Sequence, residues 1–283
     1  MDLKPHKTET WIHKPIENIE EFNETVEVVC EVYKQAPLLA KQGVHTISID
    51  EKTGIQALER EITHMSPGQI ERQDNEYKRH GTQCLIANLD VVTGEIISPT
   101  ISNHRTEKDF VEHIEKTLQQ DKTGKWIFIC DNLNTHQSES LVRLVAKSSK
   151  INKNLGVKGK DGILKSMNSR AEFLSDTKHR IRLVYTPKHA SWLNQIEIWF
   201  SIIVKRLLKR LSVFSVKELK EKIVALYIYN KGGCPPCGIC LQVIAEFATK
   251  KTLIYWKNAD GKEMTSRIGD LLPYLFNQKF LKK

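Results

Sequence analysis

The spacing of apolar positions changes along the chain from a helical to a strand-like period. Through residues 16–32, apolar residues recur at steps of three and four between six glutamates, which predicts an amphipathic helix with an acidic outer face. Residues 44–50, 84–92 and 95–99 alternate or are rich in β-branched side chains, which is typical of strands. A Thr-Gly turn joins the last two of these strands into a hairpin.

The pattern continues as an alternation of helices and strands. A capping-box sequence at Thr106 opens a predicted helix, and the continuous apolar run at 126–130 predicts a strand that is buried on both faces. A short helix follows, then a fifth strand at 180–185 and a long helix over about 191–211. Hairpin-linked strands followed by this alternation predict a mixed five-stranded sheet with helices on its faces.

Charge is distributed unequally between the two halves of the chain. Residues 1–150 carry 18 basic and 24 acidic side chains, a net charge of −6, whereas residues 151–283 carry 25 and 10, a net charge of +15. The basic half favours a polyanionic partner, although a lysine-rich solvated surface would give the same count. Residues 147–178 are rich in Lys, Gly and Ser and are interpreted as a basic insertion with one short helix near 162–174.

Composition excludes several classes of protein. No run of 18 apolar residues predicts a membrane span, and the N-terminal residues lack the apolar core of a signal peptide. Six cysteines in 283 residues are too few for a disulfide framework, so we expect a soluble intracellular protein. Cys234, Cys237 and Cys240 are clustered, but structural zinc needs four ligands, so a loop of free thiols is the favoured interpretation.

Three carboxylates stand where α/β proteins place their chemistry. Asp50 ends the first predicted strand and Asp131 ends the buried fourth strand. Glu197 lies one turn into the long helix, on a polar stripe beside the face that packs on the core. Each also has an ordinary explanation, because Asp often follows a strand as a turn residue and Glu is favourable near a helix N-terminus.

Taken together, the three carboxylates predict a metal site. Carboxylates that converge on one place repel each other unless cations lie among them, and Mg²⁺ is a cation that prefers such oxygen ligands. Two such ions can activate water on one side of a phosphodiester and stabilise the leaving oxygen on the other. The basic half of the chain would bind the phosphates.

Four sequence strings resemble the DDE transposases of the mariner-like bacterial insertion-sequence group. They are DEKTGIQALER at 50–60, RHGTQ at 79–83, DNLNTH at 131–136 and TPKHASWLNQIEIWF at 186–200. The resemblance implies a ribonuclease-H-like fold in which Asp50, Asp131 and Glu197 bind the metal, with Mn²⁺ able to replace Mg²⁺. It also implies transposition into TA dinucleotides by at least a dimer on DNA.

The chain differs from that family in three ways. Met1 begins almost at the catalytic domain, so we expect either a truncated copy or a separately encoded helix-turn-helix subunit that reads the element's ends. Asp131 and Glu197 are 66 residues apart, wider than in the mariner-like group, and the insertion at 147–178 accounts for the excess. The resemblance fades after Asn230. The expected organisation is an acidic helical lead-in (1–41), a catalytic domain (42–212) and a C-terminal helical extension with a divergent tail (213–283).

Further residues are candidates for supporting or DNA-binding roles. Asn132 could fix its turn or the metal ligands, His136 could order a carboxylate, contact phosphate or serve as a core residue, and Asn194 could hold Glu197 or contact DNA. Trp192 and Trp199 are expected in the core rather than as platforms on which bases stack. The candidate phosphate-binding residues are Lys188, His189, Lys205, Arg206, Lys158 and Lys160.

The function that these features favour is that of a transposase catalytic subunit. It would hydrolyse phosphodiesters at transposon ends and then join the freed 3′-OH to target DNA, in the bacterial cytoplasm with the nucleoid. Two alternatives stay open. One is a nuclease or resolvase on the same fold that never joins strands, and the other is a non-catalytic DNA-binding relic of a transposase.

Overall fold

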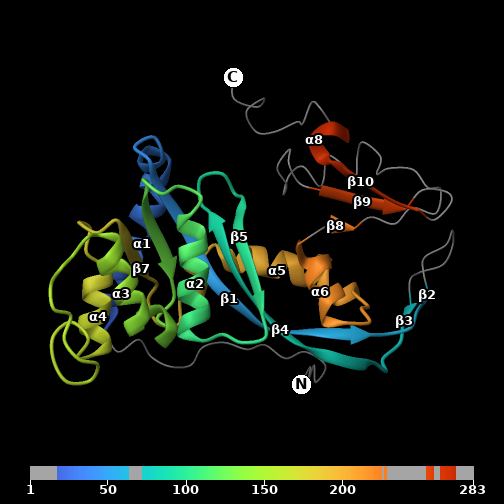
Figure 1. Cartoon of the computed structure of the whole chain (residues 1–283), viewed down its shortest axis with the longest axis horizontal. Coiled ribbons are helices and arrows are strands. Elements are labelled where there is room, and N and C mark those ends of the chain that lie inside the picture. Colours follow the sequence, from blue (N-terminus) through green and yellow to red (C-terminus); the bar gives the residue numbers. More distant parts are fainter. Residues whose placement is uncertain (1–17, 64–71, 225, 228–252, 258–261, 272–283) are drawn as a thin grey trace, which may run out of the picture.

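A five-stranded mixed sheet forms the centre of the molecule (Figure 1). The computed structural model describes residues 18–63, 72–224, 226–227, 253–257 and 262–271. In sheet order the strands are β5 (Ile96–Ser102), β4 (Lys78–Asp90), β1 (Val44–Glu59), β6 (Lys125–Cys130) and β7 (Ile181–Tyr185). β1, β6 and β7 are parallel, whereas β4 is antiparallel to both of its neighbours. This arrangement confirms the expected ribonuclease-H-like mixed sheet.

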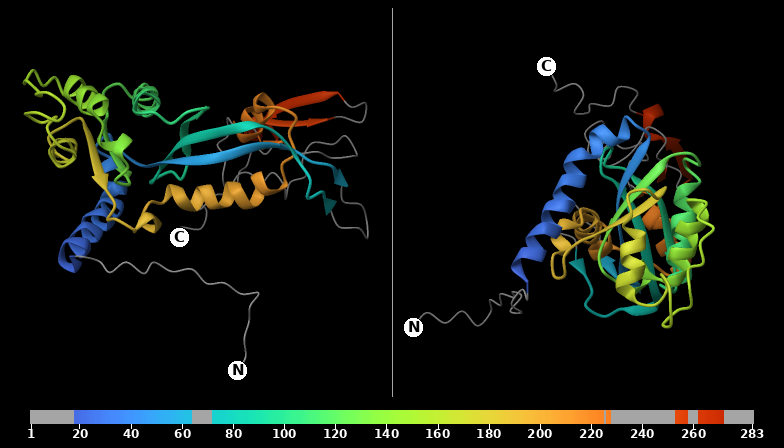
Figure 2. Two further views of the ribbon diagram at one scale, coloured as in Figure 1. Left: turned by 90° about the horizontal axis from the view of Figure 1, so that it is seen from below. Right: turned by 90° about the vertical axis from the view of Figure 1, so that its left-hand side faces the viewer.

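Helices cover both faces of the sheet, as the sequence predicts (Figure 2). One face packs against α2 (Glu107–Leu118), α3 (Glu139–Ser148) and α4 (Met167–Leu174), and the other against α1 (Ile19–Ala40) and α5 (Ile196–Arg206). Successive strand residues supply the two faces in turn, since Phe128 contacts the core under α2 and Ile129 contacts the core under α1. The expected capping box of Thr106 and Asp109 begins α2.

The two central antiparallel strands continue beyond the sheet as a long ribbon. The predicted first strand ends at Asp50, but β1 extends to Glu59 and stays paired with β4. The pairing shifts between Lys52 and Ile55, where Gly54 takes the positive φ of +72° that glycine adopts without strain. The ribbon is stabilised by burial of apolar side chains against α5 and α6 (Val216–Val224). The short strands β2 (Ile62–Thr63) and β3 (Arg72–Gln73) pair near its end (Figure 1).

Several elements differ from the sequence prediction in the last third of the chain. The predicted helix over 191–211 is three pieces, because the 3₁₀ turns η2 (Ser191–Leu193) and η3 (Leu208–Arg210) flank α5. A further 3₁₀ turn, η1 (Asn134–Gln137), follows β6. Within the predicted C-terminal helical extension and divergent tail (213–283), the described part contains α6, a small sheet and α8 (Ile268–Leu271). That sheet consists of β8 (Leu226–Tyr227), β9 (Leu253–Lys257) and β10 (Glu263–Arg267).

Among the described residues, no helix has both the length and the apolar composition that are needed to cross a membrane. The clustered cysteines, Cys234, Cys237 and Cys240, lie outside these ranges.

Candidate active site

The register of the parallel strands brings Asp50 and Asp131 to the same edge of the sheet. Ser48 of β1 pairs with Ile129 of β6, and each aspartate follows its strand partner by two residues. Because neighbouring strands lie about 4.8 Å apart, the two aspartates come from adjacent positions. Asp131 directly follows the end of β6, as the sequence predicts, whereas Asp50 lies within β1, which continues to Glu59, so the prediction that Asp50 ends its strand is wrong.

Glu197 approaches this edge because the beginning of α5 is bonded to β1. The backbone N–H of Ile196 donates to Ser48 Oγ at 2.9 Å, and Asn194 Nδ2 donates to Asp50 Oδ2 at 3.1 Å. Glu197 is the next residue after Ile196, in the first turn of the helix. Asn194 was expected to hold Glu197 or contact DNA, but it is fully buried and bonds to Asp50 instead.

The acidic helix α1 also fixes the approach of α5. Tyr33 donates its hydroxyl hydrogen to the carbonyl of Leu193 at 2.8 Å and accepts the N–H of Gln195 at 3.3 Å. The sequence assigned α1 only a surface role, and it also missed Ser48. A signal for Ser48 was available, since a serine between isoleucines of a buried strand needs a hydrogen-bond partner.

Asp50 is a buried carboxylate whose charge is opposed by its surroundings. Its side chain accepts the Glu51 N–H at 2.7 Å, and the residue is 8% exposed. The pKa of Asp50 is raised to about 6, first by burial and then by the negative charges of Asp131 and Glu197, which together outweigh the Glu51 N–H and the charge of His136. Asp131 and Glu197 are thus each near enough to Asp50 to repel its negative charge.

Asp131 is held in the opposite way, by groups that favour its charge. Burial alone would raise its pKa, but hydrogen bonding by His136, the charge of His136 and the N–H of Leu133 lower the pKa below its ordinary value. Although burial opposes a positive ring, the hydrogen bond to Asp131 and the Cys130 thiol raise the pKa of His136 well above its ordinary value. Asn132 fixes the turn, as one of its two expected roles, because its Nδ2 donates to the Thr186 carbonyl at 2.6 Å.

The donor set fits a hard divalent cation better than a softer metal. All three candidate ligands are carboxylates, and the pKa of Asp50 is raised mainly by burial and in smaller part by the negative charges of Asp131 and Glu197, which a cation would neutralise. Over the described ranges, the side chains of His, Cys, Asp and Glu form no group of three or more that is gathered closely enough to hold an ion. Asp50 lies in β1 and Asp131 directly follows β6, whereas Glu197 lies in α5.

Three of the expected DNA-binding residues, Lys188, His189 and Lys205, are exposed on segments next to or within α5. Lys188 and His189 are exposed in the turn between β7 and η2, where His189 adopts a positive φ of 64°. Lys205 is exposed near the end of α5, and the side chain of Arg206 is outside the described part. Trp192 was expected in the core, and that prediction is wrong, because the residue is 66% exposed. Trp199 does pack against the core, as predicted.

The basic insertion is anchored to the catalytic domain by apolar residues and one arginine. Leu164 and Leu174 are buried in the core under α3, and α4 forms within the predicted helical stretch. Arg170 is buried and donates to the carbonyl oxygens of Gln137 and Leu164 at 2.7 and 3.1 Å. The lysines of the insertion are exposed, and Lys158 forms an ion pair with Glu107 of α2 at 3.8 Å.

We expect the insertion to contribute phosphate contacts. Changing Lys158, Lys160 and Lys165 to Gln should weaken DNA binding and flatten its salt dependence by about 0.9 in slope for each lost contact. Unfolding should change little, because exposed charges contribute about 0–1 kcal/mol each. The measurement is DNA affinity across a series of salt concentrations, combined with thermal unfolding.

The matched control for this experiment removes three lysines elsewhere. Lys34, Lys41 and Lys122 are exposed on or near helices away from the insertion, and their change to Gln gives the same change in net charge. Equal slopes for both triple variants would show that the insertion makes no specific phosphate contacts.

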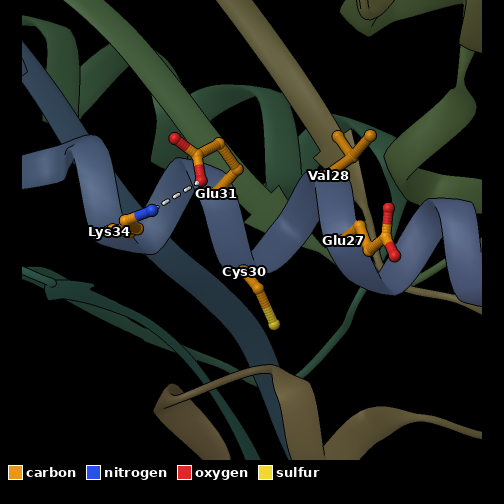
Figure 3. Close-up of a pocket in the computed structure, with 5 residues that line it drawn as sticks. All are labelled: Glu27, Val28, Cys30, Glu31 and Lys34. Carbon is orange, nitrogen blue, oxygen red and sulfur yellow. Dashed lines mark ion pairs between the residues drawn. The ribbon is translucent and has the colours of Figure 1, made fainter.

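A shallow hollow on the outer side of α1 lies apart from this site (Figure 3). It is lined by Glu27, Val28, Cys30, Glu31 and Lys34, and an ion pair of 3.5 Å joins Lys34 to Glu31. None of the candidate site residues line it, so it plays no part in the chemistry considered below.

Comparison with known proteins gives a family match and several distant structural similarities. A family model described as DDE superfamily endonuclease matches residues 45–220. No curated protein sequence matches significantly. The structure of the Mos1 mariner paired end complex with Mn is 13% identical with a TM-score of 0.46, over 77% of this chain and 57% of that one. The Mos1 paired-end complex with the left transposon end is 16% identical with a TM-score of 0.46, over 78% of this chain and 58% of that one. The Mos1 catalytic domain is 14% identical with a TM-score of 0.43, over 75% of this chain and 83% of that one.

The family model provides the assignment. The chain spans under three fifths of the Mos1 chains in the two paired-end complexes. The family match covers more than half of the 283 residues and includes Asp50, Asp131 and Glu197. The chain therefore belongs to the DDE superfamily endonucleases.

Proposed function

We propose that this chain is the catalytic subunit of a DNA transposase. The observation that carries the proposal is the approach of Asp131 and Glu197 to a buried Asp50, whose pKa their charges raise. Mutual repulsion of this kind is relieved when divalent cations bind, and catalytic carboxylates of this number suit phosphodiester chemistry. Membership of an endonuclease family supports the same reaction class.

Asp50, Asp131 and Glu197 would hold the metal, Mg²⁺ or Mn²⁺, with two ions expected. Bound there, the ions would supply an activated water and stabilisation of charge on the phosphate oxygens. The chain's own residues would keep the ligands in place, since Ser48 and Asn194 fix α5 against β1. Lys188, His189 and Lys205 would hold the DNA backbone next to the carboxylates.

The reaction would proceed as two in-line displacements at phosphorus. In the first, water adds to a phosphorus at the transposon end, the P–O3′ bond breaks, and the leaving 3′-oxygen takes a proton. In the second, that 3′-OH loses its proton as its oxygen attacks a target phosphodiester, so one P–O3′ bond forms as another breaks, and the leaving 3′-oxygen of the target takes a proton. A TA target, a homodimer on DNA, a separately encoded helix-turn-helix subunit and a cytoplasmic, nucleoid-associated location form part of the proposal.

A cleavage-and-joining assay tests the function. The substrate is DNA carrying this coding region with both flanks, end-labelled and mixed with a target plasmid, under Mg²⁺, under Mn²⁺ or with a chelator. We expect metal-dependent cuts at the element's ends followed by joined products. Cutting without joining would identify a nuclease or resolvase instead. Binding without any cutting would identify a non-catalytic relic.

A further inference from the structure

A second acidic side chain lies directly behind the site, on the other face of the sheet. Glu51 follows Asp50 in β1, so the strand alternation directs it toward α2 rather than α5. Its side chain is 1% exposed, and neither carboxylate oxygen has a hydrogen-bond partner among the described residues. A buried carboxylate is costly unless positive groups compensate its charge, so its neighbours require an explanation.

The neighbours of Glu51 connect it to Asp131 through one imidazole ring. His136 is fully buried, and its Nε2 lies 3.9 Å from Glu51 Oε1. On the other side of the ring, Nδ1 lies 2.8 Å from Asp131 Oδ1 and 3.2 Å from the backbone carbonyl oxygen of the same residue. Arg105 approaches Glu51 Oε2 at 3.8 Å from the surface. The side chains of Glu51, His136 and Asp131 therefore form a chain across the edge of the sheet.

The imidazole ring itself cannot move freely. Phe110 of α2 packs on it with 4.3 Å between ring centroids. The backbone carbonyl of His136 accepts the hydroxyl hydrogen of Tyr185 at 2.9 Å. His136 belongs to the 3₁₀ turn η1, and Arg170 donates a hydrogen bond to the carbonyl of Gln137 in the same turn. Asp131, in contrast, is 40% exposed and follows the end of its strand. A fixed donor beside a partly exposed carboxylate restricts the orientations of that carboxylate.

We propose that His136 and Glu51 are positioning residues, which orient the Asp131 carboxylate for metal binding. His136 would act by its hydrogen bond through Nδ1. Glu51 would act one step further away, by holding the Nε2 side of the ring and so the direction of Nδ1. Hydrogen-bond partners of metal ligands commonly have this effect, and their loss costs about 10–100-fold in metal affinity or activity. The inference depends on the proposed function, because it assumes that Asp131 binds a metal.

Mn²⁺ binding to the whole chain, measured by calorimetry without DNA, tests the proposal. His136→Leu removes the donor while keeping an apolar side chain against Phe110, and should weaken Mn²⁺ binding about 10–100-fold. His136→Asn keeps an N–H donor near the position of Nδ1 and should restore most of the affinity. Glu51→Gln keeps the shape and should weaken binding about tenfold or less. Cleavage by each variant should recover when Mn²⁺ is saturating, so the half-maximal Mn²⁺ concentration changes more than the maximal rate.

The control is another buried histidine. His113 on α2 is 1% exposed and bonds to Thr100 at 2.8 Å, away from the carboxylates. His113→Leu should alter thermal unfolding without altering Mn²⁺ affinity. Where His136→Leu fails to fold, as judged by thermal unfolding, Glu51→Gln and His136→Asn carry the test.

The outcomes separate this inference from the function on which it depends. If His136→Leu and Glu51→Gln bind Mn²⁺ as the wild type does while Asp131→Asn does not, the positioning role is refuted and the metal site stands. If the wild type binds no Mn²⁺, or Asp131→Asn binds it equally well, the proposed metal site fails and this inference fails with it.

Discussion

Glu197→Gln should reduce DNA cleavage about a thousandfold while DNA binding persists. The side chains are nearly equal in volume, so α5 should still pack through Ile196, Phe200 and Ile203, which are buried. An amide oxygen is a poorer ligand for a hard cation than a carboxylate oxygen. Loss of about 4 kcal/mol of transition-state stabilisation corresponds to this factor in rate. Single-turnover cleavage and a DNA-binding titration measure the two effects separately.

Two controls accompany this prediction. Glu139 lies in the first turn of α3 and pairs with Arg143 at 2.6 Å, so Glu139→Gln makes the same chemical change at another helix start and should leave cleavage unchanged. Wild type with Ca²⁺ should behave like the Glu197 variant with Mg²⁺, because the loose coordination of Ca²⁺ does not impose Mg²⁺ geometry. Cleavage by Glu197→Gln within a few-fold of wild type would exclude Glu197 as a ligand.

The metal-free protein should lose stability relative to Asp50→Asn as the pH rises from 4 to 7. The pKa of Asp50 is about 6 in the folded chain, compared with an ordinary value of 3.8 for an exposed aspartate. Because the folded pKa is the higher one, the folded state binds the proton more tightly. The contribution of the Asp50 proton to the stability of the folded state is therefore fully present below about pH 3.8 and is lost as the pH rises through about 6. The loss amounts to about 3 kcal/mol.

Chemical unfolding of both proteins at several pH values, with a chelator present, measures this difference. Asparagine at position 50 presents its amide to Asn194, but that cost does not depend on pH and so cancels from the trend. Saturating Mn²⁺ should reduce the loss for the wild type, since an ion compensates the ionised carboxylate. A difference that stays constant from pH 4 to 7 would mean that the charge of Asp50 is already compensated in the folded protein.

The positions of Asp50 and Asp131 could be predicted because they depend on local patterns. An apolar, β-branched segment identifies a strand, and the parallel pairing of β1 with β6 then places Asp50 beside Asp131, although β1 itself continues past Asp50 to Glu59. Glu197 could be assigned to a helix, but the start of that helix could not be located. Asn194 leaves the helical conformation, with ψ of 103°, and its side chain bonds to β1. That contact joins residues more than 140 positions apart in the sequence, so the local periodicity of apolar residues cannot predict it.

The same limit explains the misplaced tryptophan and the unexpected ribbon. Helical phase assigned Trp192 to the packing face, but η2 precedes the break at Asn194 and so follows a different phase. The strand beyond Asp50 depends on pairing with β4 and packing on α5, which are tertiary contacts. The burial of Glu51 could have been predicted, because Glu51 follows Ile47 and Ile49 in the alternating series of residues that face the core on the α2 side of β1.

Strand β1 carries three residues of the candidate site, and these residues lie on both of its faces. Ser48 anchors α5, Asp50 faces the candidate metal site, and Glu51 faces the imidazole behind it. Because side chains alternate, insertion or deletion of a single residue upstream in β1 would exchange the two sides. Asp50 would then enter the apolar core under α2 and Glu51 would meet α5. Substitutions elsewhere in this strand alter one contact at a time, whereas a change of length there would dismantle the anchor, the ligand and its support in a single step.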